Sequence, residues 1–225
     1  MEALWPEPRE PPTPPEKPRR LIHRFCESIR ISKLFLLQTS SATSSSQSRY
    51  NGGVSFRIRK FEKADFDTLW RIDQACFDSQ LAYSRPELAF YMRRPGSFTL
   101  VAESIGTGVR ENVRGNGGGP GGILGSGILG FIVAETRRKT GHIITIDVVA
   151  EARRAGVGSA LLWAAEEQLS RAGAVAVALE TPVNNEAAIR FYKKKGYFVE
   201  KTVAGYYSNG LDALVMTKEL APVTR

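Results

Sequence analysis

The stretch RRAGVGSALL, residues 153–162, decides the fold, because it joins an apolar strand to an amphipathic helix through a tight glycine turn. The preceding strand reads GHIITIDVV (141–149), and the helix reads VGSALLWAAEEQLSRAG (157–173). The apolar stripe of that helix consists of Val157, Leu161, Leu162, Ala165 and Leu169. The first amides of a helix have no acceptor in their own helix, and the helix dipole places positive charge there. A phosphate or another anion is therefore expected at this turn.

A dinucleotide-binding fold is the nearest alternative use of a glycine turn after a strand. It is disfavoured because EARRA (151–155) separates the strand from the glycines, and because Leu161 occupies the place of the third small residue. GSGILG (125–130) also matches the dinucleotide pattern, but it runs into a strand. The glycine-rich stretch 106–122 lacks the Lys-Ser/Thr pair of a phosphate loop and is expected to be a flexible insertion.

Hydrophobic periodicity on both sides of this stretch predicts the remaining elements. Strands are expected at VSFRIRKF, SFTLVAE, ILGFIVAE, AVAVALE, YFVEKTV and LDALVMTKEL, with the second and third of these forming a hairpin. Helices are expected at ADFDTLWRIDQACF, at SRPELAFYM with a Ser84–Glu87 capping box, and at NEAAIRFYKKKG with Asn184 as its N-cap. The order is β, α, α, β, β, β, α, β, α, β, β, which predicts one α/β sandwich around a mixed sheet.

Composition limits the classes of protein that fit. The chain has 225 residues and a formal charge of +8, which favours anionic partners. Residues 1–53 are rich in Pro and Ser and are expected to be a disordered tail, followed by a domain over 54–222. The tail carries a net charge of +3 and the remainder +5, so direct nucleic-acid binding is not expected. No apolar run is long enough to span a membrane, and cytoplasmic localisation is expected.

The pattern R-x-x-G-x-G formed by Arg153, Gly156 and Gly158 resembles motif A of the GNAT N-acetyltransferases. Downstream, LETPVNNEAAIRFYKKKGY and GYYSNGLDALVMTKEL resemble the ribosomal-protein alanine N-acetyltransferase (RimI-like) branch of that family. The resemblance covers Val54 to about Leu220 and implies a three-layer α/β sandwich around a central mixed β-sheet. It also implies acetyl-CoA as the co-substrate. The tail and the glycine-rich insertion have no counterpart in the family pattern.

The same resemblance implies which residues hold acetyl-CoA. Backbone groups of the strand are expected to bind the pantetheine arm, and the turn is expected to wrap the pyrophosphate. An amide of the strand could also stabilise the tetrahedral oxyanion. The expected cofactor-binding residues are Ile146, Asp147, Val148, Arg153, Arg154, Ala155, Gly156, Val157, Gly158, Ser159 and Asn185.

Glu180 is the general base that the resemblance implies. The alternative is an ordinary solvated strand end. Glu180 closes an apolar row formed by Ala174, Ala176 and Ala178 on one face of its strand, and an acid in that position favours a cleft.

Tyr192 is the general acid that the resemblance implies, protonating the thiolate of CoA. A packed aromatic residue is the more common role of a tyrosine on an amphipathic helix. Spacing favours the family role, because Asn185, Ile189 and Tyr192 share one helix face. The opposite face, with Ala187, Ala188 and Phe191, is then expected to pack on the core.

Tyr206 and Tyr207 are expected to border a peptide-substrate groove, although a pair of aromatic residues at a strand edge is nearly as consistent with the pattern. The other wall is expected in CFDSQLAYSRPEL (76–88), which departs from the PWS motif of the family.

His23 and His142 show no metal-ligand spacing, so no metal is expected. Cys76 has no histidine near it in sequence, and a thiol nucleophile is not suggested.

Together these features predict an enzyme that transfers acetyl from acetyl-CoA to a protein N-terminal α-amine by direct attack in a ternary complex. A ribosomal protein is a candidate acceptor. Acetylation of a lysine or small amine remains an alternative, as does a non-catalytic acetyl-CoA sensor. The acceptor's first residue and the oligomeric state stay open at this stage.

Overall fold

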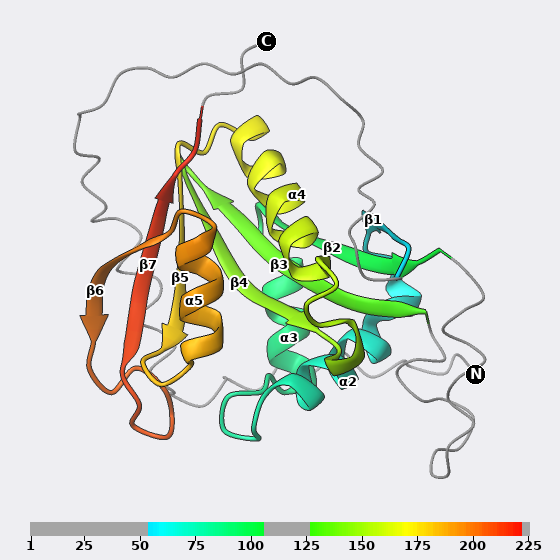
Figure 1. Ribbon diagram of the computed structural model, residues 1–225, viewed down its shortest axis with the longest axis horizontal. Coiled ribbons are helices and arrows are strands. Elements are labelled where there is room, and N and C mark those ends of the chain that lie inside the picture. The colour runs from blue at the N-terminus through cyan, green and yellow to red at the C-terminus, as the bar shows by residue number, and fades with distance from the viewer. Residues whose placement is uncertain (1–53, 106–126, 222–225) are drawn as a thin grey trace, which may run out of the picture.

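The computed structural model describes residues 54–105 and 127–221 (Figure 1). The predictions for the tail 1–53 and for the insertion 106–122 lie outside the described residues. The strands are β1 (Phe56–Lys60), β2 (Ser97–Ser104), β3 (Ile128–Arg137), β4 (Thr140–Val148), β5 (Ala176–Pro182), β6 (Phe198–Val203) and β7 (Ala213–Glu219). The helices are α2 (Phe66–Cys76), α3 (Arg85–Arg93), α4 (Val157–Arg171) and α5 (Glu186–Lys194), with short 3₁₀ turns η2 (Lys63–Asp65) and η5 (Ala150–Ala152). The predicted order of strands and helices is confirmed.

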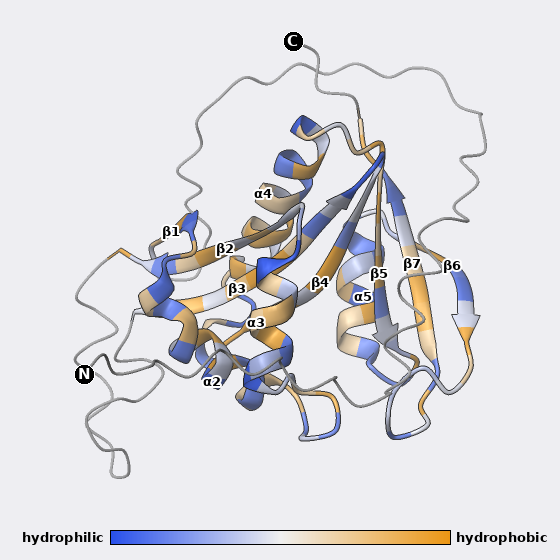
Figure 2. Ribbon diagram, turned by 180° about the vertical axis from the view of Figure 1, so that it is seen from behind, coloured by the Kyte–Doolittle hydropathy of each residue, from blue (hydrophilic) through white to orange (hydrophobic). Residues whose placement is uncertain are grey.

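The strands form one mixed sheet in the order β1-β2-β3-β4-β5-β7-β6. Every neighbouring pair is antiparallel except β4 and β5, which are parallel. Helices α4 and α5 cover one face of the sheet, and α2 and α3 cover the other, as the front and back views show (Figures 1 and 2). The predicted α/β sandwich around a mixed sheet is therefore confirmed.

Strands β4 and β5 separate partway along their length. Their pairing covers only Thr140–Ile143 against Ala176–Leu179. Beyond that point β4 stays paired with β3 as far as Val148, and β5 stays paired with β7 as far as Pro182. A bulge in the β3–β4 register coincides with the separation. Beyond this point the facing edges of β4 and β5 do not pair with each other, and we call the region between these two edges the opening.

The apolar stripe predicted for α4 is buried against the sheet, since Leu161 and Leu169 are 0% exposed. Helix and sheet approach closely at Gly141, where an added Cβ would lie 2.6 Å from Cδ1 of Leu169. This contact fixes α4, and with it the glycine turn at its start, against the end of β4 that pairs with β5.

The predicted cap and faces of α5 need correction. Asn185, not Asn184, is the N-cap, and its Oδ1 accepts a hydrogen bond from the Ala188 amide at 3.1 Å. Ala187 is exposed rather than packed on the core, because it shares a helix face with the exposed charged residues Arg190 and Lys194. The capping box of Ser84 and Glu87 at the start of α3 is confirmed.

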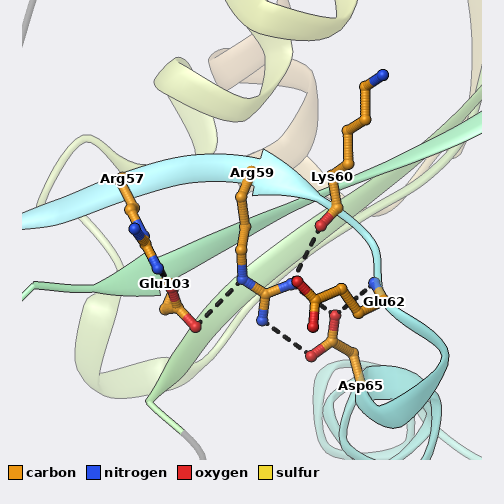
Figure 3. Close-up of polar contacts among 6 residues, drawn as sticks. All are labelled: Arg57, Arg59, Lys60, Glu62, Asp65 and Glu103. Atoms are coloured by element: carbon orange, nitrogen blue, oxygen red, sulfur yellow. Dashed lines mark hydrogen bonds and ion pairs between the residues drawn. The ribbon is translucent and has the colours of Figure 1, made fainter.

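Strand β1 is tied to the following turn by an ion-pair cluster centred on Arg59 (Figure 3). The Arg59 guanidinium donates to both carboxylate oxygens of Asp65, at 2.7 and 2.9 Å, and lies 3.1 Å from Glu103 on β2. Arg57 donates to the same Glu103 from the strand surface. Burial would raise the pKa of Asp65, but hydrogen bonds from Arg59 and from the Glu62 amide outweigh it and lower that pKa. Hydrogen bonds from Arg57 and Arg59 lower the pKa of Glu103.

We expect Arg59→Gln to lower the free energy of unfolding by about 2 kcal/mol at pH 7, because it removes charge-assisted bonds from a largely buried side chain. Carboxyl pKa values that are depressed in the folded state add stability above the unfolded pKa of about 4, and that stability is lost as pH falls. The difference between the variant and the parent should therefore shrink below pH 4. Urea denaturation at pH 7 and pH 3.5 measures both effects.

Arg57→Gln is the matched control, because the Arg57 side chain is 64% exposed and its ion pair is screened by solvent. A loss of stability in Arg57→Gln equal to that in Arg59→Gln would contradict this account of the cluster.

Candidate active site

The turn between β4 and α4 has the geometry of an anion site. Arg154 and Gly156 both have positive φ, at 63° and 87°, and such an alternating backbone curves around its own amides. The first helical hydrogen bond of α4 runs from the Ala160 amide to Gly156 O at 3.0 Å. The amides that precede Ala160 in the first turn therefore have no acceptor within the helix. The predicted pyrophosphate segment, residues 154–159, thus fits a phosphate.

Arg153, which was predicted to bind the cofactor, also contacts the chain itself. Its Nε donates to Val148 O at 3.1 Å, and its Nη2 lies 3.7 Å from Sγ of Cys76. The side chain thus joins the turn to the end of β4 and to α2. Burial, followed by the charge of Asp147, raises the pKa of Cys76 to about 11, although Arg153 acts in the opposite direction. The thiol of Cys76 is accordingly protonated at neutral pH.

The edge of β4 that borders the opening carries Ile144, Ile146 and Val148. Alternation along a strand directs the backbone groups of these three residues to the same side. The Tyr83 hydroxyl donates to Ile144 O at 3.5 Å, and Val148 O accepts from Arg153. Ile146 lies between these two contacts, where its backbone groups can meet a pantetheine arm.

Asp147 was predicted to bind the cofactor together with Ile146 and Val148, but its side chain is buried while theirs are partly exposed. It is 1% exposed, and Thr145 Oγ1 donates to its Oδ2 at 3.1 Å. Burial and the nearby carboxylate of Asp73 raise the pKa of Asp147 well above its usual range. Because the Asp147 side chain is buried in this way, its backbone is the part of the residue that is placed to bind a cofactor.

Asn185 and Tyr192 lie on α5 beside the glycine turn. A Cβ added at Gly158 would lie 3.7 Å from Cζ of Phe191, which places the two helices side by side there. Asn185 is half-buried and uses Oδ1 as a helix cap. Tyr192 is 6% exposed, and its ring packs edge-on against Phe191 and Tyr197 with centroids 5.2 and 5.6 Å apart.

The hydroxyl of Tyr192 remains a donor at any physiological pH. Burial, followed by the charge of Asp147, raises its pKa above the usual value for tyrosine. The electrostatic coupling to Asp147 places Tyr192 near the segment of β4 that borders the opening. Tyr192 is therefore both a packed aromatic residue, as the alternative prediction held, and a neighbour of the opening.

Glu180 lies at the other edge of the opening and contacts His142, a residue that sequence reasoning treated only as a poor metal ligand. His142 Nε2 is 2.7 Å from Glu180 Oε2, and the two side chains are 5% and 14% exposed. The parallel register pairs His142 with Ala178, so Glu180 lies two residues further along the same face of β5. The predicted row of Ala176, Ala178 and Glu180 is thus the row that meets His142.

His142 carries a positive charge in this environment. Burial disfavours the imidazolium, but the carboxylates of Glu180 and Glu135 outweigh it and raise the pKa of His142 to about 10. One signal in the sequence pointed here: His142 is the single ionisable side chain within the apolar stretch GHIITI, and a polar residue in such a strand needs a partner.

The predicted substrate residues Tyr206 and Tyr207 lie in the β6–β7 loop, with ring centroids 5.0 Å apart. Tyr206 is 5% exposed, and burial followed by the charge of Glu180 raises its pKa. Ser208 Oγ in this loop donates to Gln80 O at 2.9 Å. The β6–β7 loop and the α2–α3 loop, which were expected to form the two walls of a groove, thus contact each other beside Glu180.

Tyr83 and Tyr91 complete this aromatic surface from the α2–α3 side. Their ring centroids are 5.3 Å apart, and the charges of both tyrosines contribute to the raised pKa of Tyr206.

Within residues 54–105 and 127–221, no three His, Cys, Asp or Glu side chains are grouped to hold a metal ion. The helices of the same residues include none long and apolar enough to cross a membrane.

Comparison with known proteins defines the class of this site. The acetyltransferase (GNAT) family model matches residues 66–197, and an uncharacterized N-acetyltransferase of Methanocaldococcus jannaschii is 31% identical over 163 residues, covering 72% of this chain and 90% of that protein. The chain belongs to the GNAT acetyltransferase family. It is an acyltransferase that uses acetyl-CoA as the acetyl donor.

More distant comparisons agree on the fold. Ard1 from Thermoplasma volcanium superposes with a TM-score of 0.60 at 27% identity, over 74% of this chain and 98% of that one. The ribosomal-protein-S18-alanine N-acetyltransferase of Escherichia coli superposes with a TM-score of 0.59 at 19% identity, over 76% and 97%. An N-alpha-acetyltransferase of Sulfurisphaera tokodaii is 40% identical over 83 residues, which span 36% of this chain and half of that relative.

Substitution of the two glycines of the turn should have different effects. Gly156→Ala places a side chain at φ 87°, which costs about 1–2 kcal/mol, so it should weaken both folding and acetyl-CoA binding. At Gly158 the nearest atoms to an added Cβ are Val148 Cγ2 at 3.6 Å and Phe191 Cζ at 3.7 Å, which is ordinary packing. Gly158→Ala should therefore keep the melting temperature and weaken acetyl-CoA binding about tenfold, or ~1.4 kcal/mol, because the methyl group obstructs the mouth of the opening.

Calorimetric titration with acetyl-CoA and thermal unfolding measure these two effects. Unchanged acetyl-CoA affinity in both variants would place the pyrophosphate elsewhere.

Proposed function

We propose that the enzyme acetylates the N-terminal α-amine of a protein or peptide in the cytoplasm. The observation that carries the proposal is the His142–Glu180 pair, which lies on the side of the sheet that α2 and α3 cover. Beside this pair the α2–α3 loop contacts the β6–β7 loop, and both loops carry tyrosines. The phosphate-binding turn belongs to α4, on the other face. Several relatives that match part of the chain are N-alpha-acetyltransferases, which supports the same acceptor class.

In the proposed mechanism the amine attacks acetyl-CoA directly in a ternary complex. An N-terminal α-amine has a pKa of about 7.7 to 8.0, so a modest base is enough to remove its proton. Glu180 accepts that proton, and the contact with His142 Nε2 holds the Glu180 carboxylate in place. The nitrogen forms its bond to the thioester carbonyl carbon, with the Ile146 amide near the oxygen that gains charge.

Tyr192 completes the proposed proton balance. When the carbon–sulfur bond breaks, the leaving thiolate takes the phenolic proton of Tyr192. After it forms its bond, the nitrogen gives up a second proton to leave a neutral amide, and the phenolate of Tyr192 recovers one proton from solvent in exchange. The proton that Glu180 removed from the ammonium also returns to solvent. Burial raises the pKa of Tyr192, so the hydroxyl keeps its proton until the carbon–sulfur bond breaks beside it.

The narrower proposal is an acceptor of the ribosomal-protein alanine type. Support comes from the segments 179–197 and 205–220, which resemble that branch, and from the paired Tyr206 and Tyr207 at the β6–β7 loop. We place the acetyltransferase domain at residues 54–222, with the segment 1–53 as an appended tail.

A peptide panel tests the acceptor class. Labelled acetyl-CoA is offered to peptides that differ in their first residue, with free lysine and spermidine alongside. Label at the peptide α-amine is the expected result, with alanine-first peptides preferred if the narrower proposal holds. Labelling of the small amines alone would overturn N-terminal acetylation, and acetyl-CoA binding without any transfer would indicate a sensor.

Glu180→Gln and Tyr192→Phe should each lower kcat by about 10²-fold, because each removes a proton-transfer group, while the Kd for acetyl-CoA stays within about twofold. Tyr197→Phe is the matched control: Tyr197 packs against Tyr192 but donates to Glu166 at 2.9 Å, so its removal should affect stability and leave kcat unchanged. Steady-state kinetics and calorimetry measure both quantities. Loss of acetyl-CoA binding in Glu180→Gln or Tyr192→Phe would instead assign those side chains to the cofactor site.

A further inference from the structure

Glu135 on β3 is a buried carboxylate that the proton transfers above do not use. It is 1% exposed. The antiparallel register places Glu135 directly opposite His142, so the two side chains share a face of the sheet. His142 Nδ1 lies 3.7 Å from Glu135 Oε1, while His142 Nε2 lies 2.7 Å from Glu180 Oε2. The imidazole is therefore held between two carboxylates that come from the strands on either side of it.

Two arginines contact the Glu135 carboxylate. Arg137 Nε lies 2.9 Å from Glu135 Oε1, and Arg94 Nε at the end of α3 lies 3.3 Å from Glu135 Oε2. Both arginine side chains are largely buried, at 22% and 10% exposed. A lone carboxylate in this position would be expensive to bury, and two guanidinium groups offset that cost. The Glu135 carboxylate is thus held in place behind His142.

The charged and titratable groups that face His142 come from every neighbouring element. They are Glu135 and Arg137 from β3, Arg94 from α3, Glu180 from β5, and Tyr206 from the β6–β7 loop beyond Glu180. Glu135 and Glu180 are the two of these groups that lie within 4 Å of the imidazole nitrogens. Because Glu180 also faces the acceptor, Glu135 is the partner of His142 that stays unchanged through the reaction.

We propose that Glu135 is a positioning residue of the acetyl-transfer site, which holds His142 in the orientation and charge state that directs its Nε2–H at Glu180. This inference rests on the proposed role of Glu180 as the base. Before the acceptor amine binds, the cluster of two carboxylates and one imidazole holds one titratable proton. His142 carries it and is an imidazolium. When Glu180 takes a proton from the acceptor amine, the cluster holds two, and Glu135 still balances the imidazolium. Without Glu135, the imidazole would lose the carboxylate beside Nδ1 that holds its orientation toward Glu180.

Histidine NMR tests the charge state without any substrate. In the full chain the His142 imidazole should be doubly protonated at pH 8, with a titration midpoint above that pH. In Glu135→Gln the midpoint should fall by at least about one unit, because one of the two carboxylates that favour the imidazolium is gone. Glu166→Gln is the matched control. Glu166 is likewise a buried acid with a cationic partner, Lys218 at 2.6 Å, but it lies outside this cluster, so His142 should titrate as in the parent.

Kinetics then test whether Glu135 acts through His142. Glu135→Gln should lower kcat about tenfold with the KM for acetyl-CoA unchanged. In a His142→Gln background the same substitution should change kcat less than about twofold, because the residue through which it acts is absent.

Several results would overturn the proposal. A His142 midpoint below pH 7 in the parent chain would do so even if Glu135→Gln fails to fold. An unshifted midpoint in a folded Glu135→Gln, or equal losses of kcat with and without His142, would do the same. Failure of the parent enzyme to acetylate peptides would overturn the proposed function instead, and the NMR result would still decide the role of Glu135.

Discussion

The parallel pairing of β4 with β5 stops at Ile143 and Leu179, and the chemistry of this enzyme depends on that stop. A continuous sheet would use the backbone groups of both strands in its ladder and leave no space for a substrate. Here β4 continues to Val148 on β3 alone, and β5 continues to Pro182 on β7 alone. The strands are thus held firmly on their outer sides while their inner edges remain available. Rigid strands on both sides suit a site that has to orient two substrates.

The two faces of the sheet contribute different chemistry to the opening. Helices α4 and α5 bring the anion-binding turn at residues 154–159 and the hydroxyl of Tyr192. The opposite face brings the His142–Glu180 pair and the contact between the α2–α3 and β6–β7 loops. Acetyl-CoA and the acceptor amine can therefore approach from opposite faces and meet inside the sheet. This arrangement favours direct transfer, and the protonated Cys76 thiol gives no support to an acyl-enzyme.

The local parts of this structure were predictable from the sequence, and the parts that depend on strand register were not. Periodicity and glycine turns gave the order of all the strands and helices in the described residues. The R-x-x-G-x-G pattern located the turn with the geometry of an anion site, since that geometry follows from a few consecutive backbone angles. The contact between His142 and Glu180 requires knowing that His142 pairs with Ala178, and no local pattern contains that information. Glu135 was missed for the same reason, because its partner is set by the β3–β4 register.

The two incorrect predictions for α5, its N-cap residue and the burial of Ala187, have a local cause. Asn184 and Asn185 are adjacent potential caps, and only the backbone decides which of them accepts from Ala188. Ala187 has no strong preference for burial, so its exposed neighbours Arg190 and Lys194 determine its face. Tyr192 shows that packing and function are not exclusive alternatives: its ring is buried among aromatic neighbours, and the coupling of its hydroxyl to Asp147 places it near the opening.

The most direct test of the central claim is a crystal structure with a bisubstrate analogue, in which CoA is joined through the acetyl group to the α-amine of a peptide. The account predicts the pyrophosphate against the amides of residues 154–159, the pantetheine along Ile146, and the α-nitrogen inside the opening between Glu180 and Tyr192. The peptide should leave across Tyr206 on the α2–α3 face. An analogue bound with its α-nitrogen away from Glu180, or with both halves on one face of the sheet, would contradict it.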